Sequence, residues 1–143
     1  KIIDASIEKI EISNAENFLN SSKFGAVIYF VGTVRDNNEN KEVTGITYDA
    51  KDSMVIKSFE EIYEDAESEL NIKNKAVFIE HVKGFVGLSE KSIIIGVACK
   101  HRDEAYRLSR FIIEEIKKRT PIWKKEHYKN EESEWLKGVS LTQ

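Results

Sequence analysis

The sequence predicts an α+β domain with mostly antiparallel strands and two main helices. Its 143 residues can bury one core but not two independent ones, so we expect residues 1–143 to form a single domain. An apolar content of 41% beside 33% charged residues is typical of a soluble globular chain. Segments with the apolar spacing of strands alternate with two segments that have the spacing of amphipathic helices.

The strand-like segments are spread along the chain. Residues 2–12 alternate weakly, and residues 25–34 (GAVIYFVGTV) are rich in β-branched and aromatic side chains, as in a buried strand. Further strands are expected over 43–48, 75–82, 92–99 and 122–123. Residues 36–40 (DNNEN) read as a polar loop, and Gly84 and Gly87 as the turn between two strands.

The helices are predicted from apolar side chains three and four residues apart. Ser13 and Glu16 form a capping-box pattern for a short helix that runs through Leu19. A long helix carries Val55, Phe59, Ile62, Tyr63, Ala66 and Leu70 on one face, and a second, from about 103 to 119, carries Ala105, Leu108, Ile112 and Ile116. Thr120 precedes the single proline, Pro121, and therefore ends the second long helix.

Charge is distributed unevenly along the chain. The net charge is −3, which argues against nucleic-acid binding through the overall charge of the molecule. Residues 60–69 hold six acids and no cation, whereas residues 100–125 hold nine cations and four acids. The acidic run fits the solvated face of a helix. The basic region is either a solvated face as well or the binding site of a local anion.

Lys117 and Lys124 are the candidate catalytic residues. Lys117 falls in the last turn of a helix, where the helix dipole alone explains a cation, but it lies at the margin of the apolar face. The turn at Pro121 leads into a strand that bears Lys124, so the two ammonium groups can meet in one partly dry pocket. There they would lower each other's pKa, bind an anion and transfer protons.

Further cations can complete an anion site. His101 and Arg102 lie between a strand and a helix N-terminus, a place that favours phosphate, although they can equally be surface residues that flank a cap. Arg35 ends the strand that begins at residue 25, and Phe30 within it is either a core residue or an aromatic contact for a ligand.

The sequence lacks the patterns typical of several other kinds of catalytic and binding site. Cys99 is two residues from His101, but the apolar run before it favours a buried core thiol over a nucleophile. No Cys/His spacing suggests a metal site, and no glycine-rich phosphate loop or nucleophile elbow is present. A single cysteine and the lack of an apolar run long enough to cross a bilayer lead us to expect a cytoplasmic protein without a membrane role.

Three segments together resemble the large, catalytic subunit of molybdopterin synthase. They are GAVIYFVGTVRD at 25–36, VGLSEKSIIIGVACKHRDEAY at 86–106 and IKKRTPIWKKE at 116–126, in the order and spacing of that family. The resemblance implies an α/β hammerhead-type domain with a small antiparallel β subdomain. It also implies a homodimer that binds a small ubiquitin-like sulfur-carrier subunit.

The resemblance also implies an activity and roles for residues. Sulfur would pass from the carrier's C-terminal thiocarboxylate to cyclic pyranopterin monophosphate, which forms the dithiolene of molybdopterin without a cofactor or resident metal. Lys117 and Lys124 would be catalytic. The residues implied in substrate binding are Arg35, His101, Arg102, Lys125, Glu126 and Phe30. Two other hypotheses remain at this point: a non-catalytic module that binds phosphate or RNA, and an enzyme with Cys99 as nucleophile.

Overall fold

The computed structural model describes residues 1–129 and 134–135. This part contains three helices, which are α1 (Ile12–Leu19), α2 (Asp52–Leu70) and α3 (Arg102–Arg119). The strands are β1 (Ile2–Asp4), β2 (Ala26–Thr33), β3 (Asn37–Asn38), β4 (Lys41–Ala50), β5 (Lys75–Gly87), β6 (Lys91–Cys99), β7 (Ile122–Tyr128) and β8 (Glu134–Trp135). The predicted α+β class and the two long helices are confirmed.

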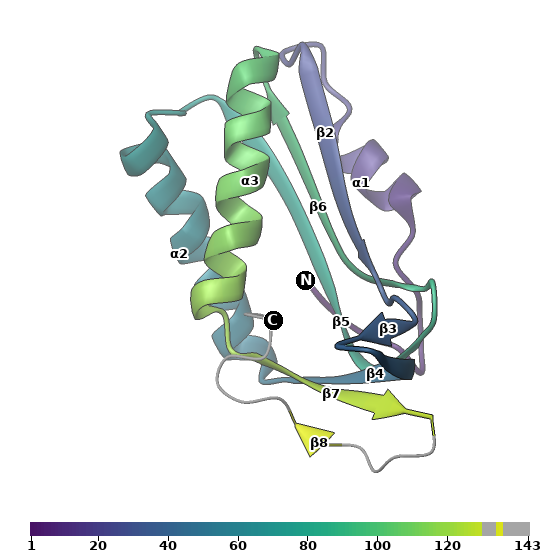
Figure 1. The fold of residues 1–143 in the computed structure, drawn as a ribbon. Coiled ribbons are helices and arrows are strands. Elements are labelled where there is room, and N and C mark those ends of the chain that lie inside the picture. The colour runs from purple at the N-terminus through teal and green to yellow at the C-terminus, as the bar shows by residue number, and fades with distance from the viewer. Residues whose placement is uncertain (130–133, 136–143) are drawn as a thin grey trace.

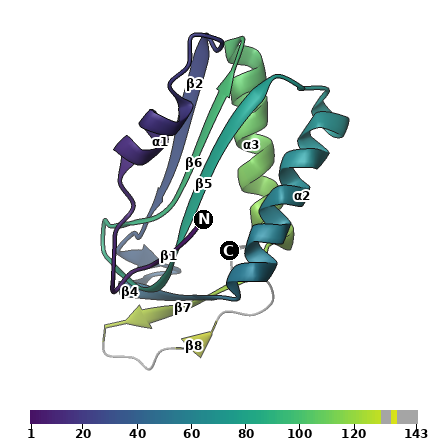
Figure 2. The ribbon, with the colours of Figure 1, turned by 180° about the vertical axis from the view of Figure 1, so that it is seen from behind.

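The strands join into one sheet with helices on both faces. Its order is β2-β6-β5-β4-β7-β8, with β1 beside β5 and β3 beside β4. All pairs are antiparallel except β1 with β5. Helices α2 and α3 lie side by side on one face, and α1 covers the other (Figures 1 and 2).

Strand β5 connects two parts of this sheet. Its first half pairs with β6 through residues 75–81, and its last residues, 84–87, pair with β4. The second part, made of β3, β4, β7 and β8, is the small antiparallel subdomain below the long strands in Figure 1. The turn predicted at Gly84 and Gly87 was wrong, since both glycines belong to β5. Gly84 has a φ of +101°, a conformation that glycine adopts without strain, and it lies where β5 begins to pair with β4.

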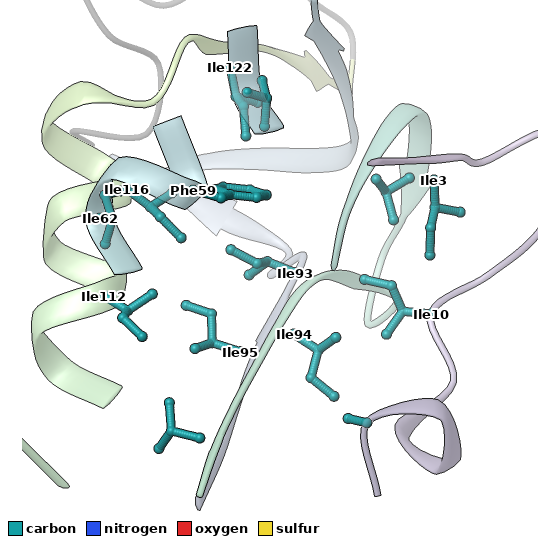
Figure 3. Packing of buried hydrophobic residues seen from close by; sticks show 14 of the residues in the cluster. Ile3, Ile10, Phe59, Ile62, Ile93, Ile94, Ile95, Ile112, Ile116 and Ile122 are labelled. Carbon is teal, nitrogen blue, oxygen red and sulfur yellow. The ribbon is translucent and has the colours of Figure 1, made fainter. Parts of the chain in front are cut away.

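The core is built around β6. Residues 92–99 are buried without interruption, because α3 covers one face of the strand and α1 the other. Ile93 and Ile95 point toward Ile112 and Ile116 of α3, and Ile94 points to the opposite side (Figure 3). The helix residues that the apolar spacing placed inward, from Val55 through Ile116, are buried except Tyr63 and Leu70.

Three local predictions need correction. Residues 2–12 form a strand only as far as Asp4, and α1 starts at Ile12 with Glu11 as its N-cap, so Ser13 lies inside the helix and makes no capping bond. β2 is an edge strand rather than a buried one, with Val27 and Tyr29 exposed. The polar loop at 36–40 contains β3, which pairs with the start of β4.

Candidate functional site

The connection between α3 and β7 builds one wall of the site. α3 ends at Arg119, and the backbone N–H of Thr120 donates to the carbonyl of Ile116. The Thr120 hydroxyl is hydrogen-bonded to Ser58 of α2 at 2.8 Å, which fixes this turn against the neighbouring helix. β7 then leads away from the helix end, so Lys117 in the last turn and Lys124 on the strand face the same space.

This space is a cavity of about 300 Å³, which we call the lysine cavity. Strands β2, β3, β4 and β7 and the end of α3 contribute to it. Its lining residues are Thr33, Arg35, Asn37, Asn38, Val43, Ile46, Tyr48, Lys117, Lys124 and Glu126. Three cations and a single carboxylate therefore line it, which suits an anionic ligand.

Glu126 is held rigidly at the cavity wall. It is 4% exposed and accepts hydrogen bonds from Asn38 Nδ2, at 2.9 and 3.1 Å to its two oxygens, and from the Tyr128 hydroxyl at 2.7 Å. Glu126 lies opposite Ile46 in the β4–β7 ladder and two residues after Lys124, so its carboxylate is on the same face of β7 as Lys124. The carboxylate can thus balance part of the positive charge in the cavity.

Lys124 is the lysine whose protonation state the surroundings change. Burial lowers its pKa, Glu126 opposes this effect, and the positive charges of Lys117 and Arg35 lower the pKa further. A larger fraction of this amine is therefore neutral near physiological pH than in a free lysine. A half-buried amine of this kind can accept a proton or donate one during a reaction.

A second cavity, which we call the inner chamber, continues behind the two lysines. It measures about 140 Å³ and shares Tyr48, Lys117 and Lys124 with the lysine cavity. Its remaining lining residues are Phe30, Gly32, His81, Ser92, Ile93 and Ile113. Tyr48 lies opposite Lys124 in the β4–β7 ladder, so this tyrosine forms part of the boundary between the two spaces.

The structure does not bring all predicted site residues together. Arg35, Lys117, Lys124 and Glu126 line the lysine cavity, and Phe30 lines the inner chamber. Lys125 neighbours Lys124 on β7 and therefore points to the other face of the strand, outside both cavities.

His101 and Arg102 lie at the other end of α3. His101 is the N-cap of this helix, and both side chains are exposed. Lys117 follows Arg102 by 15 positions, which corresponds to about 22 Å along the helix axis. Within one copy of the chain, these two residues do not reach the lysine cavity.

The basic region at 100–125 is not one continuous patch. Four of its cations form ion pairs on the surface: Arg107 with Asp103, Arg110 with Glu114, Lys118 with Glu115, and Arg119 with both Asp65 and Glu115. These pairs follow helix spacing or cross to α2, as expected for a solvated helix face. This arrangement does not favour the hypothesis of an RNA-binding module.

Cys99 is a core residue. It is fully buried in β6, and burial raises the pKa of its thiol to about 11. A thiol with this pKa is rarely present as the reactive thiolate at physiological pH. The structure therefore argues against a Cys99 nucleophile and agrees with the core position expected from the apolar run.

Within residues 1–129 and 134–135, no helix combines the length and the apolar character needed to cross a membrane. The same residues hold no group of three or more His, Cys, Asp or Glu side chains arranged for a metal ion.

Four site residues were missed in the sequence. Tyr48, His81 and Ser92 line the inner chamber, and Asn38 holds Glu126. His81 is isolated in the sequence, and it reaches the chamber only because β5 lies between β4 and β6 in the sheet. The one available signal was a histidine in a strand rich in apolar residues, since a buried polar side chain needs a hydrogen-bond partner.

Comparison with known proteins gives consistent results. A family model described as "MoaE protein" matches residues 5–119. A molybdopterin synthase catalytic subunit from Synechococcus elongatus is 37% identical over 141 residues, which cover 99% of this chain and 85% of that protein.

Solved structures show the same fold. Molybdopterin synthase from Staphylococcus aureus superposes with a TM-score of 0.87 at 29% identity and covers 96% of both chains. A complex of subunits 1 and 2 of molybdopterin-converting factor from Helicobacter pylori has a TM-score of 0.76 at 24% identity. It covers 98% of this chain and 91% of the matched one. At that identity, the second likeness supports the fold alone.

Proposed function

The chain belongs to the MoaE family, and we propose that it is the catalytic subunit of a molybdopterin synthase. The reaction is sulfur transfer from the C-terminal thiocarboxylate of a small carrier protein to cyclic pyranopterin monophosphate, which yields the dithiolene of molybdopterin. The observation that carries this proposal is the lysine cavity, where Lys117, Lys124 and Arg35 converge beside one fixed carboxylate.

The charge of the cavity fits both reactants. A thiocarboxylate and a phosphate monoester are anions, and bringing them within about 4 Å of each other without counter-charges would cost about 4 kcal/mol near a protein surface. The three cations of the lysine cavity offset this repulsion. Arg35 suits the phosphate because its planar guanidinium can make two parallel hydrogen bonds to it.

The two lysines have different surroundings and therefore can take different roles. Lys124 is half-buried with a lowered pKa, so it can exchange protons with the reacting groups. Lys117 is exposed at the end of α3 and stays accessible to the carrier's acyl carbon. Glu126 and Phe30 complete the walls, and Lys125 lies at the outer side of β7, where it can contact the carrier.

A second copy of the chain would bring His101 and Arg102 to the site. β2 is an edge strand whose Ala26 end lies beside Cys99 and whose Thr33 end lies beside Lys91. If two β2 strands pair antiparallel, the Ala26 end of one copy meets the Thr33 end of the other. The α3 N-terminus of one copy then lies near Arg35 and Lys117 of its partner. The exposed side chains of Val27 and Tyr29 agree with an edge that is covered in a homodimer.

The proposed partner is a small ubiquitin-like sulfur-carrier subunit. A relative that is named a catalytic subunit belongs to an assembly with a further subunit, and membership of the same family supports a second subunit for this chain. The carrier's C-terminal tail would enter the lysine cavity and place its thiocarboxylate beside Lys117. We place this reaction in the cytoplasm, as the unpaired thiol of Cys99 suits a reducing compartment.

Reconstitution tests the function. Purified chain, thiocarboxylated carrier and cyclic pyranopterin monophosphate should yield molybdopterin, measured as its oxidised fluorescent derivative. Lys117→Ala should nearly abolish product while the protein stays folded and still binds the carrier. Lys118→Ala is the matched control, since Lys118 forms a surface ion pair with Glu115 and should keep wild-type activity. Absence of product with wild-type protein would refute the function, and full activity of Lys117→Ala would refute the role of Lys117.

A further inference from the structure

The inner chamber contains a buried histidine that the proposed roles do not use. His81 lies on β5, is 1% exposed and has its Nδ1 atom 2.8 Å from the carbonyl oxygen of Val82. A carbonyl oxygen only accepts hydrogen bonds, so Nδ1 must carry the proton. The other ring nitrogen, Nε2, is left with a lone pair and can only accept a hydrogen bond.

The ring of His81 borders the inner chamber. No hydrogen bond to this atom is formed by the described residues. Among those residues, the single fully enclosed side-chain polar atom without a partner is Oε1 of Glu80, so Nε2 is not fully enclosed. His81 lines the inner chamber, and Nδ1 is held by the Val82 carbonyl, so Nε2 is the ring nitrogen left for a partner in that space. Burial lowers the pKa of His81 to about 4, which keeps the ring neutral near physiological pH.

Other polar groups face the same space from fixed positions. The Tyr48 ring packs edge-on against His81, with 4.9 Å between the ring centroids and 77° between the ring planes. The Ser92 hydroxyl donates to the carbonyl of Gly32 at 3.2 Å, and Ser92 lines the chamber together with Tyr48. Lys117 and Lys124 contribute N–H donors at the side facing the lysine cavity.

The chamber has the size and the polar partners that ordered water needs. One water requires roughly 10–15 Å³ of such space and two to four hydrogen bonds. The chamber measures about 140 Å³, so several waters fit. An acceptor at His81 and donors at the lysines would orient a water with one O–H toward the ring and its oxygen toward the lysine cavity.

We infer that the inner chamber holds the water that hydrolyses the acyl intermediate of sulfur transfer, and that His81 is a positioning residue for this water. The inference rests on the proposed function. Once the thiocarboxylate sulfur has bonded to the substrate, carrier and substrate are joined as a thioester. The water oxygen adds to the acyl carbon, the C–S bond breaks, and its electron pair stays on sulfur as the substrate thiolate.

The protons of this step can be followed to named groups. The Lys124 amine in its neutral form takes one proton from the water as the oxygen attacks. The carrier leaves with a carboxylic acid, which releases the second proton to solvent, and no oxidant or reductant is needed. His81 does not take a proton, because an imidazole with so low a pKa is a weak base, and it acts only as a hydrogen-bond acceptor.

Two substitutions of His81 separate the Nδ1 contact with the Val82 carbonyl from the hydrogen-bond acceptor Nε2. The side chain of His81→Asn is short and can keep the contact to the Val82 carbonyl, but it has no acceptor at the position of Nε2. His81→Gln extends to that position and can supply an amide oxygen there. Under single-turnover conditions with thiocarboxylated carrier, intact-protein mass spectrometry should show the carrier–substrate conjugate accumulating in His81→Asn. We expect hydrolysis to slow about 10- to 100-fold, the range that follows from misplacing one reactant.

Formation of the conjugate should keep its wild-type rate in His81→Asn, and His81→Gln should restore part of the hydrolysis rate. Ile95→Val, a buried core substitution on β6 at a residue that does not line the chamber, should not accumulate conjugate. Rapid hydrolysis in both His81 variants would overturn the inference while leaving the proposed function intact. Equal slowing of conjugate formation and of hydrolysis would do the same. If wild-type protein forms neither conjugate nor product, the proposed function fails instead.

If His81→Asn does not fold, His81→Gln and Tyr48→Phe still test whether the chamber holds an ordered water for hydrolysis. Tyr48→Phe removes the phenol oxygen beside the chamber but keeps the ring contact with His81. Slower hydrolysis with visible conjugate in Tyr48→Phe supports an ordered water, and unchanged hydrolysis in both of these variants contradicts it.

Discussion

The buried imidazole of His81 predicts a specific dependence of stability on pH. Its pKa is lowered from 6.5 to about 4 in the folded chain, so the unfolded chain binds the proton first as the pH falls. The fold therefore keeps its full stability above pH 6.5 and loses stability as the pH falls from there to about 4. Between pH 7 and pH 4.5, this linkage amounts to about 2 kcal/mol of unfolding free energy.

Urea denaturation at these two pH values measures the effect. His81→Asn has no group that titrates at this position. The difference in unfolding free energy between wild type and this variant should therefore shrink by about 2 kcal/mol at the lower pH. Acidic groups elsewhere affect both proteins equally and cancel in the comparison. His101→Asn removes a histidine from an exposed position and is the matched control. If the stabilities of wild type and His81→Asn change in parallel with pH, burial does not lower the pKa of His81, and this reasoning is refuted.

Two further predictions concern the chamber and the core. Gly32→Ala places a Cβ 2.7 Å from Cγ2 of the stiff, buried Ile93, so we expect a loss of about 1–3 kcal/mol in thermal or urea unfolding. Gly87→Ala meets only the flexible tip of Glu90 and should cost less, and equal losses would contradict the tight packing at Gly32. Cys99→Ala should keep wild-type activity in the reconstituted assay and lose on the order of 1 kcal/mol of stability, whereas an inactive, folded variant would restore the nucleophile hypothesis.

The elements that the sequence predicts well are those with a simple apolar period. Ala105, Leu108, Ile112 and Ile116 recur at helix spacing, and the stop at Thr120 and Pro121 follows from local sterics, so α3 ends where expected. These signals are local, and they also predict the strand after the turn. That is why the meeting of Lys117 and Lys124 could be anticipated from the residues between them.

The features that could not be predicted depend on pairing between distant strands. Residues 26–33 have the composition of a buried strand, but β2 lies at the sheet edge, and composition does not reveal a strand's place in the order. The long β5 passes through Gly84, where a glycine also fits the expected turn. His81, Tyr48 and Ser92 come from three different strands, so no sequence spacing connects them.

The distance between the two groups of cations also required the structure. His101 and Arg102 are near Lys117 in sequence, and a compact anion site was a reasonable interpretation. The length of α3 separates them within one copy of the chain. Only the unpaired edge of β2 indicates how a second copy could close that gap.

A complementation experiment tests most directly that two copies of this chain build one sulfur-transfer site. Lys117→Ala and Arg102→Ala should each be nearly inactive in reconstituted molybdopterin synthesis. Unfolded and refolded together in equal amounts, the two variants would assort into the proposed homodimer, and in each mixed dimer one of the two sites would have both native residues. Random assortment predicts a return of about a quarter of wild-type activity. Activity that stays at the level of the separate variants would contradict a site shared between subunits, and full activity of Arg102→Ala alone would remove that residue from the site.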